Sequence, residues 1–446
     1  MKSYIPFVKD HWAPLAFGFL AIFWGNFGQT FFIGLFSASI QQSLALSSSA
    51  YGFAYSLATL ASAFTIIWAG GLIDRVSLKV YTAAVCLGLA VAAAIMSQVF
   101  NLTTLIIGFY GLRLFGQALL PHTGSTTTAR AFELNRGKAL SIASSGVPAG
   151  EIVLPLLGIA MIGSLGWQNT FLTIALVVVF LVLPMMLYVV SCSGLRQSPF
   201  RATNTVSSTN SREDTLLNPS ARPSPPSSPQ PSPQPSPQSP PQSPPKAGGA
   251  RRALLFDDRY WLALPGLMAG PFIITGIFIH QDFIISSKGW TPAWFAACFV
   301  VYGVMHWISS LIAGVLVDRF RAVNLLPYYL LPMAIALLVL AFLEGDWVAL
   351  ALMSLLAMSI GSSPPITGSL WPEIYGISSI GTLRSMNIAI MVFATALSPA
   401  LYGFLIDQQT SLTWIFGGSA VYLLLACVLF SFSYTARPEK HAIALR

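Results

Sequence analysis

Gly-Gly-Leu-Ile-Asp-Arg, at residues 70–75, stands between two long apolar runs of the sequence. A near copy, Gly-Val-Leu-Val-Asp-Arg, occupies residues 314–319 and also follows an apolar run. The same offset along the chain relates Gly137 to Gly381. An internal repeat of this length, in a chain this apolar, is typical of membrane proteins built from two homologous halves.

The composition indicates an integral membrane protein. Hydrophobic residues make up 55% of the 446 residues and charged residues only 9%, whereas about 25% of a soluble domain is charged. The apolar runs are about 20 to 25 residues long, the length of a helix that crosses a hydrocarbon core of about 30 Å. Strands of a membrane barrel would be shorter and would alternate in polarity. We therefore expect an all-α membrane protein.

We predict twelve membrane-spanning helices in two pseudo-symmetric six-helix bundles. Residues 1–191 would form the first bundle and residues 257–446 the second. The linker between them, residues 192–256, is rich in Pro and Ser, so it should be an extended spacer or else a docking site for a proline-binding partner. The predicted spans are residues 12–36, 51–73, 80–100, 103–127, 138–162, 169–191, 260–285, 294–317, 322–343, 347–369, 382–406 and 412–434.

The basic residues predict the orientation of the chain. If both termini are cytoplasmic, every Lys and Arg except Lys288 and Arg113 falls on the cytoplasmic side, as the positive-inside rule requires. The net charge of +8 is therefore explained by topology, and we expect no nucleic-acid partner.

The sequence contains no motif of an enzyme or of a metal site. The four cysteines, Cys86, Cys192, Cys298 and Cys427, have no spacing typical of disulfide pairing or metal binding. There is no Gly-x-x-x-x-Gly-Lys-Ser/Thr loop, which disfavours an ATP-driven pump. We therefore expect no enzymatic activity, no cofactor and no metal.

The repeated loop resembles a signature of the major facilitator superfamily of transporters, Gly-x-x-x-Asp-Arg-x-Gly-Arg-Lys between helices 2 and 3. Gly70, Asp74 and Lys79 match it, whereas Ser77 and Leu78 replace the second Gly and an Arg. The resemblance implies two six-helix bundles around a central cavity. It also implies that Asp74 latches the halves together at the cytoplasmic end of helix 11. Our gating candidates are Asp74, Arg75, Asp318, Arg319 and Arg130.

Two further stretches are similar to one group within the superfamily. Residues 130–150 resemble loop 4–5 and helix 5 of monocarboxylate-porter-like members, and residues 371–376 resemble bacterial members of that group. Helix 8, however, lacks the acidic–arginine pair of true monocarboxylate porters, and helix 1 lacks their lysine.

Two ionisable residues, Arg113 and Glu151, lie deep inside predicted spans. A lone charge at the bilayer centre costs about 2.5–3.5 kcal/mol, so each should face a cavity or the other. At about 1.5 Å per residue both lie about 15 Å from the outer ends of helices 4 and 5, and we expect them to pair. Arg113 also resembles the helix 4 arginine of the superfamily, although Gly116 and Gln117 are exchanged relative to its Arg-x-x-Gln-Gly pattern. The pair could be a static link between helices or a binding site for substrate or protons.

Other polar residues lie near the middle of the predicted spans. Asn26, Gln29 and Thr30 share one face of helix 1. His306 is near the middle of helix 8, and Ser363 precedes two prolines that should kink helix 10. Each could instead bond a neighbouring helix, and His306 could be a satisfied interior histidine. We take them as further candidates for substrate or proton binding. Helix 2 carries a similar polar face: Tyr55, Thr59 and Ser62.

The sequence predicts a secondary transporter that moves a small solute by alternating access. An organic anion carried with protons is the favoured solute, because Arg113 supplies a deep fixed positive charge. The alternatives are an efflux pump for amphipathic compounds and, less favoured, a non-transporting membrane sensor. We expect a monomer in a cell membrane, a bacterial inner membrane being favoured, whose partners are the lipid bilayer and a small-molecule substrate.

Overall fold

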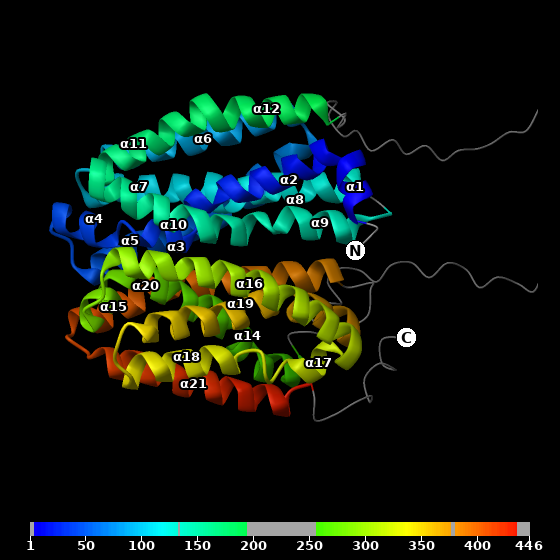
Figure 1. Ribbon diagram of the computed structural model, residues 1–446. Helices are drawn as coiled ribbons and strands as arrows, with labels where there is room; N and C mark the ends of the chain where they lie inside the picture. The colour runs from blue at the N-terminus through cyan, green and yellow to red at the C-terminus, as the bar shows by residue number, and fades with distance from the viewer. Residues whose placement is uncertain (1–3, 133, 194–255, 376–379, 435–446) are drawn as a thin grey trace, which may run out of the picture.

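The computed structural model describes residues 4–132, 134–193, 256–375 and 380–434. Within these ranges the regular structure is helical throughout, which confirms the all-α prediction. Figure 1 shows the helices of the first half and of the second half as two bundles lying against each other. Most of the predicted linker lies outside the described residues.

The described residues of the first half form six helical runs that correspond to the first six predicted spans. They are α1 (Tyr4–Asp10), α2 (Trp12–Gly25), η1 (Asn26–Gly28), α3 (Thr30–Gly34) and α4 (Ser37–Leu44); α5 (Ser48–Ala69) and η2 (Gly70–Asp74); α6 (Leu78–Ser97); α7 (Leu102–Gly111), η3 (Leu112–Leu119) and α8 (Leu120–Ala131); α9 (Arg136–Ser144) and α10 (Gly146–Leu165); and α11 (Trp167–Val177), η4 (Val178–Val182) and α12 (Leu183–Cys192).

The described residues of the second half form the other six runs. They are α14 (Asp258–Ile279) and α15 (Gln281–Lys288); α16 (Pro292–Phe320); α17 (Ala322–Leu325) and α18 (Leu331–Phe342); α19 (Trp347–Tyr375); α20 (Ile380–Asp407); and α21 (Leu412–Phe432). Among the described residues, eleven helical runs are long and apolar enough to cross a membrane, and the ninth predicted span contains the shorter helix α18.

The bundle has two ends, which we call the terminal end and the distal end. The first described helix α1, the last turn of α12, the first turn of α14 and the last turn of α21 lie at the terminal end, and α4 and α15 lie at the distal end (Figure 1). The halves meet where α5 packs against α20 and where α10 packs against α16. These two helix pairs therefore position any site between the halves.

Several helices begin at the distal end with a side chain that caps the first turn. Ser47 Oγ accepts from the backbone N–H of Ala50, and Asn101 Oδ1 accepts from the N–H of Thr104. Such caps satisfy backbone donors that have no partner within the helix. The polar residues between apolar runs thus fix where these spans begin.

The first and fourth spans depart from regular α-helix where they face each other. The first span is interrupted at η1, and Gln29 adopts an extended conformation before α3 begins. The fourth span contains the π-helical segment η3. A Cβ added to Gly28 would lie 2.1 Å from the carbonyl oxygen of Leu112, so the two irregular segments approach through bare backbone at Gly28. π-Helical segments within α-helices are frequent at functional sites.

Candidate functional site

Arg113 is buried on η3 and faces the interrupted first span. Its guanidinium lies over the Tyr55 ring, 4.9 Å from the ring centroid, and its Nη1 donates to Thr30 Oγ1 at 3.4 Å. The hydroxyls of Thr30 and Tyr55 are 3.0 Å apart, so the three side chains form one group, the arginine cluster. Only 5% of Arg113 is exposed. Among the described residues its Nε has no hydrogen-bond partner, and no carboxylate forms an ion pair with it.

Glu151 does not pair with Arg113, and the predicted pair is wrong. Its Oε2 lies 2.8 Å from Nδ1 of His306, which belongs to α16 of the other half. Helix α10 extends to Leu165, beyond the predicted span, so Glu151 lies about 21 Å from the distal end of its helix. Arg113 lies about 16 Å from the start of α7. The two residues therefore differ in depth by about one helical turn, and they face different neighbours.

The Glu151–His306 pair is a polar link between the halves at mid-depth. Glu151 is only 4% exposed, and α10 packs against α16 at this level. On the distal side, the His306 ring meets Tyr302 edge-on, with 6.0 Å between ring centroids. Tyr302 continues into a cluster of aromatic rings from both halves: Phe31, Phe278 and Phe299. An acid and a base, one from each half, thus lie next to an aromatic layer.

The remaining predicted candidates are not brought into one site. Asn26 Nδ2 donates to the carbonyl oxygens of Phe23 and Gly146, each at 3.0 Å, which ties the first span to α10. The half-buried side chain of Gln29 makes no hydrogen bond with described residues. Ser363 is half-buried in α19, which remains helical through the prolines that follow it. Asn26 therefore has a structural role, whereas Thr30 belongs to the arginine cluster.

Tyr51 and Gln117 are polar residues beside the arginine cluster that the sequence prediction left out. Tyr51, Tyr55 and Thr59 recur every four residues along α5, and Gln117 follows Arg113 on η3. The Tyr51 hydroxyl, Thr59 Oγ1 and Gln117 Oε1 are buried without a hydrogen-bond partner among the described residues. Helical spacing from Tyr55 and Arg113 was the signal that could have identified them.

The predicted gating residues lie at the terminal end. Asp74 and Arg130 form an ion pair within the first half, and both are exposed. In the second half Asp318 and Arg319 lie in the last turn of α16 and, among the described residues, form no such ion pair with α19. Glu373 of α19 instead accepts from the N–H of Ala322 at 2.8 Å. Asp74 is thus held by its own half, and its predicted contact with helix 11 stays a prediction. Arg75, like Asp318 and Arg319, remains a candidate.

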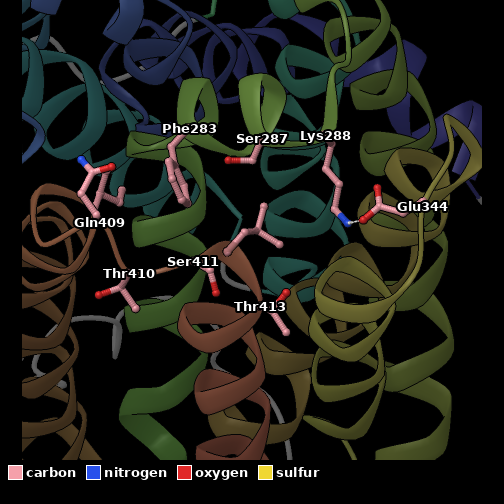
Figure 2. Close-up of a pocket in the computed structure, with 10 residues that line it drawn as sticks. Phe283, Ser287, Lys288, Glu344, Gln409, Thr410, Ser411 and Thr413 are labelled. Atoms are coloured by element: carbon pink, nitrogen blue, oxygen red, sulfur yellow. Dashed lines mark hydrogen bonds and ion pairs between the residues drawn. The ribbon is translucent and has the colours of Figure 1, made fainter.

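A pocket of about 590 Å³ opens at the distal end of the second half. Figure 2 shows Lys288 beside Glu344 at its edge. Lys288 Nζ donates to Glu344 Oε1 and to the carbonyl oxygen of Leu343, each at 2.8 Å. Only 3% of the Lys288 side chain is exposed. Because this ammonium is already paired, the pocket leaves no unmatched charge for a ligand, in contrast to Arg113. Its other lining residues are Phe283, Ser287, Ile406, Gln409, Thr410, Ser411, Leu412 and Thr413.

The site has no features of a metal centre in the part of the chain that the structure describes. No group of three or more His, Cys, Asp or Glu side chains there could hold a metal ion. The four cysteines are unpaired, and only Cys192 is exposed.

Comparison with known proteins gives one family and several similar structures. The sequence profile of the Major Facilitator Superfamily matches residues 16–304 and 267–445. A mutant of the nucleoside transporter NupG superposes with a TM-score of 0.66 at 13% identity, covering 94% of this chain and 100% of that one. A bacterial homolog of the human lysosomal transporter Spinster, in an inward-facing and unoccupied conformation, superposes with a TM-score of 0.61 at 14% identity. The superposition covers 94% of this chain and 97% of that one. No curated protein sequence matches significantly.

Proposed function

Because the chain belongs to the Major Facilitator Superfamily, we propose that it is a secondary transporter that moves a small organic anion together with protons. The solute would bind between the two halves, which would expose it alternately to either side of the membrane. The solute and the proton coupling are inferred from the chemistry of two groups, the arginine cluster and the Glu151–His306 pair.

The observation that carries the anion assignment is the unpaired charge of Arg113. A buried guanidinium is stable only with compensating interactions, and among the described residues Arg113 has a hydroxyl and a ring but no carboxylate. A carboxylate on the solute would supply the missing counter-charge through charge-assisted hydrogen bonds. The neighbouring Gln117 and Thr59 could accept or donate hydrogen bonds to other polar atoms of the solute.

The Glu151–His306 pair supports proton coupling. Histidine is the side chain whose ordinary pKa of about 6.5 places its titration between pH 5 and 8. A proton gained or lost by the pair changes the strength of a contact that joins the halves. Proton binding would thereby be linked to the relative position of the halves. We therefore assign proton binding to Glu151 with His306, in place of the Glu151–Arg113 pair that the sequence predicted.

Efflux of amphipathic compounds is the second candidate, and one observation favours it. The aromatic rings of Phe31, Phe278 and Phe299 lie beside the central pair, and such rings provide apolar contact area for a hydrophobic solute. The rings, however, pack tightly on one another and are buried, with Phe299 fully inaccessible. We therefore place them in the closed part of the pathway and keep the anion as the solute.

The experiment is a thermal-shift screen of the purified protein against carboxylates, sugars and amphipathic drugs. We expect carboxylates to raise the melting temperature. Arg113→Gln should remove this shift, while Lys79→Gln, which also deletes one positive charge, should keep it. If Arg113→Gln retains the full shift, or if only amphipathic drugs stabilise the protein, the anion assignment is wrong.

A further inference from the structure

The distal end is closed where α5 and α20 touch through bare backbone. A Cβ added to Gly52 would lie 2.1 Å from the carbonyl oxygen of Pro399, and one added to Gly403 would lie 2.3 Å from the carbonyl oxygen of Ser48. Real Cβ atoms essentially never come within 3.0 Å of such an atom, so a larger residue at either glycine would push the two helices apart. Both contacts join residues of opposite halves.

The Asp407 carboxylate strengthens the same contact. It stands at the end of α20 and binds the first turn of α5: Oδ1 accepts from the N–H of Ser48 at 3.0 Å, and Oδ2 accepts from the N–H of Ser49 at 2.9 Å. The Ser49 hydroxyl donates to Oδ2 as well. A carboxylate at a helix N-terminus satisfies unpaired backbone donors and interacts favourably with the helix dipole. Here the helix and its carboxylate belong to different halves.

Asp282 makes a second bridge of the same kind. This residue of α15 accepts from Ser37 Oγ at 2.9 Å and from Gln41 Nε2 at 3.1 Å, both on α4 of the first half. Nearby, a Cβ added to Gly34 would lie 1.8 Å from the carbonyl oxygen of Phe278. The second bridge therefore also combines an acid of the second half with a glycine–backbone contact.

We propose that Asp407 and Asp282, with the glycine contacts beside them, form the gate that holds the distal end closed. The gate uses carboxylates and neutral donors in place of ion pairs. Water can replace those donors when the halves separate, so the gate can open and reclose without stranding a buried charge. The proposal depends on alternating access but not on the identity of the solute, and it concerns the opposite end from the Asp74 loop.

The test measures the distance between the halves at the distal end. In a Cys192→Ser background, spin labels are attached at the exposed positions 42, on α4, and 408, after α20. We expect Asp407→Asn to raise the ratio of long to short distances about tenfold, because hydrogen bonds to an ionised group are among the strongest. Asp282→Asn should act in the same direction. Asp346 is an exposed acid of the same end whose side chain makes no hydrogen bond with described residues, so Asp346→Asn should leave the distances unchanged.

A second label pair separates gate opening from unfolding. Positions 42 and 100 both lie at the distal end of the first half, so their distance should stay constant if only the gate opens. If Asp407→Asn disturbs this distance too, Gly403→Ala becomes the test variant, and it should lengthen the distance between the halves without changing the distance between positions 42 and 100. Gly418→Ala is its control, because nothing lies within 4 Å of a Cβ there. The proposal is overturned if the distance between halves is the same in wild type, Asp407→Asn and Gly403→Ala. That result would not contradict the anion proposal, and a failed carboxylate screen would not contradict the proposed gate.

Discussion

Arg113 and Glu151 are both buried, but they contact different partners: Arg113 donates to Thr30, and Glu151 pairs with His306. Counting residues along a span gives an approximate depth, and burial of Arg113 and Glu151 followed from that depth. The direction of a side chain around the helix axis could not be obtained in the same way, because η3 is π-helical and turns Arg113 toward Tyr55. His306 was a candidate on its own, and its partner in the other half appears only after the halves pack together.

The first prediction concerns the Glu151–His306 pair. Replacing one partner leaves the other buried without its counterpart, which costs about 3–5 kcal/mol when a buried pair is broken. We therefore expect Glu151→Gln and His306→Gln each to lower thermal stability, and the double variant to lose less than the sum of the two. Thermal unfolding of the four proteins measures this coupling, and strictly additive losses would contradict the pairing. In transport assays, Glu151→Gln should lose the pH dependence between pH 5 and 8 while retaining solute binding.

At the scale of helices, the apolar runs predicted the spans, but not their irregular segments. Hydrophobic length alone indicated a helix over residues 12–36, whereas the structure interrupts this span at η1. No proline stands in η1, so the usual signal of a break was missing. The break becomes understandable only from Gly28, whose lack of a side chain allows η1 to approach η3.

The second prediction tests this approach between η1 and η3. A Cβ at position 28 would lie 2.1 Å from the Leu112 carbonyl oxygen and 2.5 Å from the backbone nitrogen of Gln117. Backbone atoms cannot rotate away, so Gly28→Ala should destabilise the first half by about 1–3 kcal/mol or more. Gly163→Ala, where nothing lies within 4 Å, is the matched control. A melting temperature of Gly28→Ala equal to that of Gly163→Ala would show that the segments can separate freely.

At the scale of the whole molecule, the repeat predicted two halves, and the terminal end shows how they diverged. In the first half the acid Asp74 follows the second span and the base Arg130 ends the fourth. In the second half the order is reversed: the base Arg321 follows the eighth span, and the acid Glu373 ends the tenth. Arg321 Nε lies 4.0 Å from Glu373 Oε2. The repeated Asp-Arg motif therefore did not predict which partner each half would use.

The third prediction concerns the Asp74–Arg130 pair. Since about half of the Asp74 side chain is exposed, the pair should contribute only about 0.2–1 kcal/mol to stability. Asp74→Asn should then leave the melting temperature and solute affinity almost unchanged but slow turnover, because the latch predicted from the sequence needs the carboxylate. Transport rates and binding constants of Asp74→Asn distinguish a gating role from a role in solute binding, with Asp10→Asn as a control. A large loss of affinity at an unchanged rate would place Asp74 in the binding site instead.

The last prediction is the orientation of the molecule in the membrane. Of the basic residues that the structure describes, all except Arg113 and Lys288 lie toward the terminal end, so the positive-inside rule places that end in the cytoplasm. Cys192 is an exposed native reporter there, whereas the other three cysteines are buried. A membrane-impermeant thiol reagent applied to intact cells should therefore leave the wild-type protein unlabelled and should label it after the membrane is opened. Phe100→Cys, in a Cys192→Ser background, should be labelled in intact cells, because position 100 is 73% exposed at the distal end. Labelling of Cys192 in intact cells would show that the terminal end lies outside the cell. The gate formed by Asp407 and Asp282 would then face the cytoplasm.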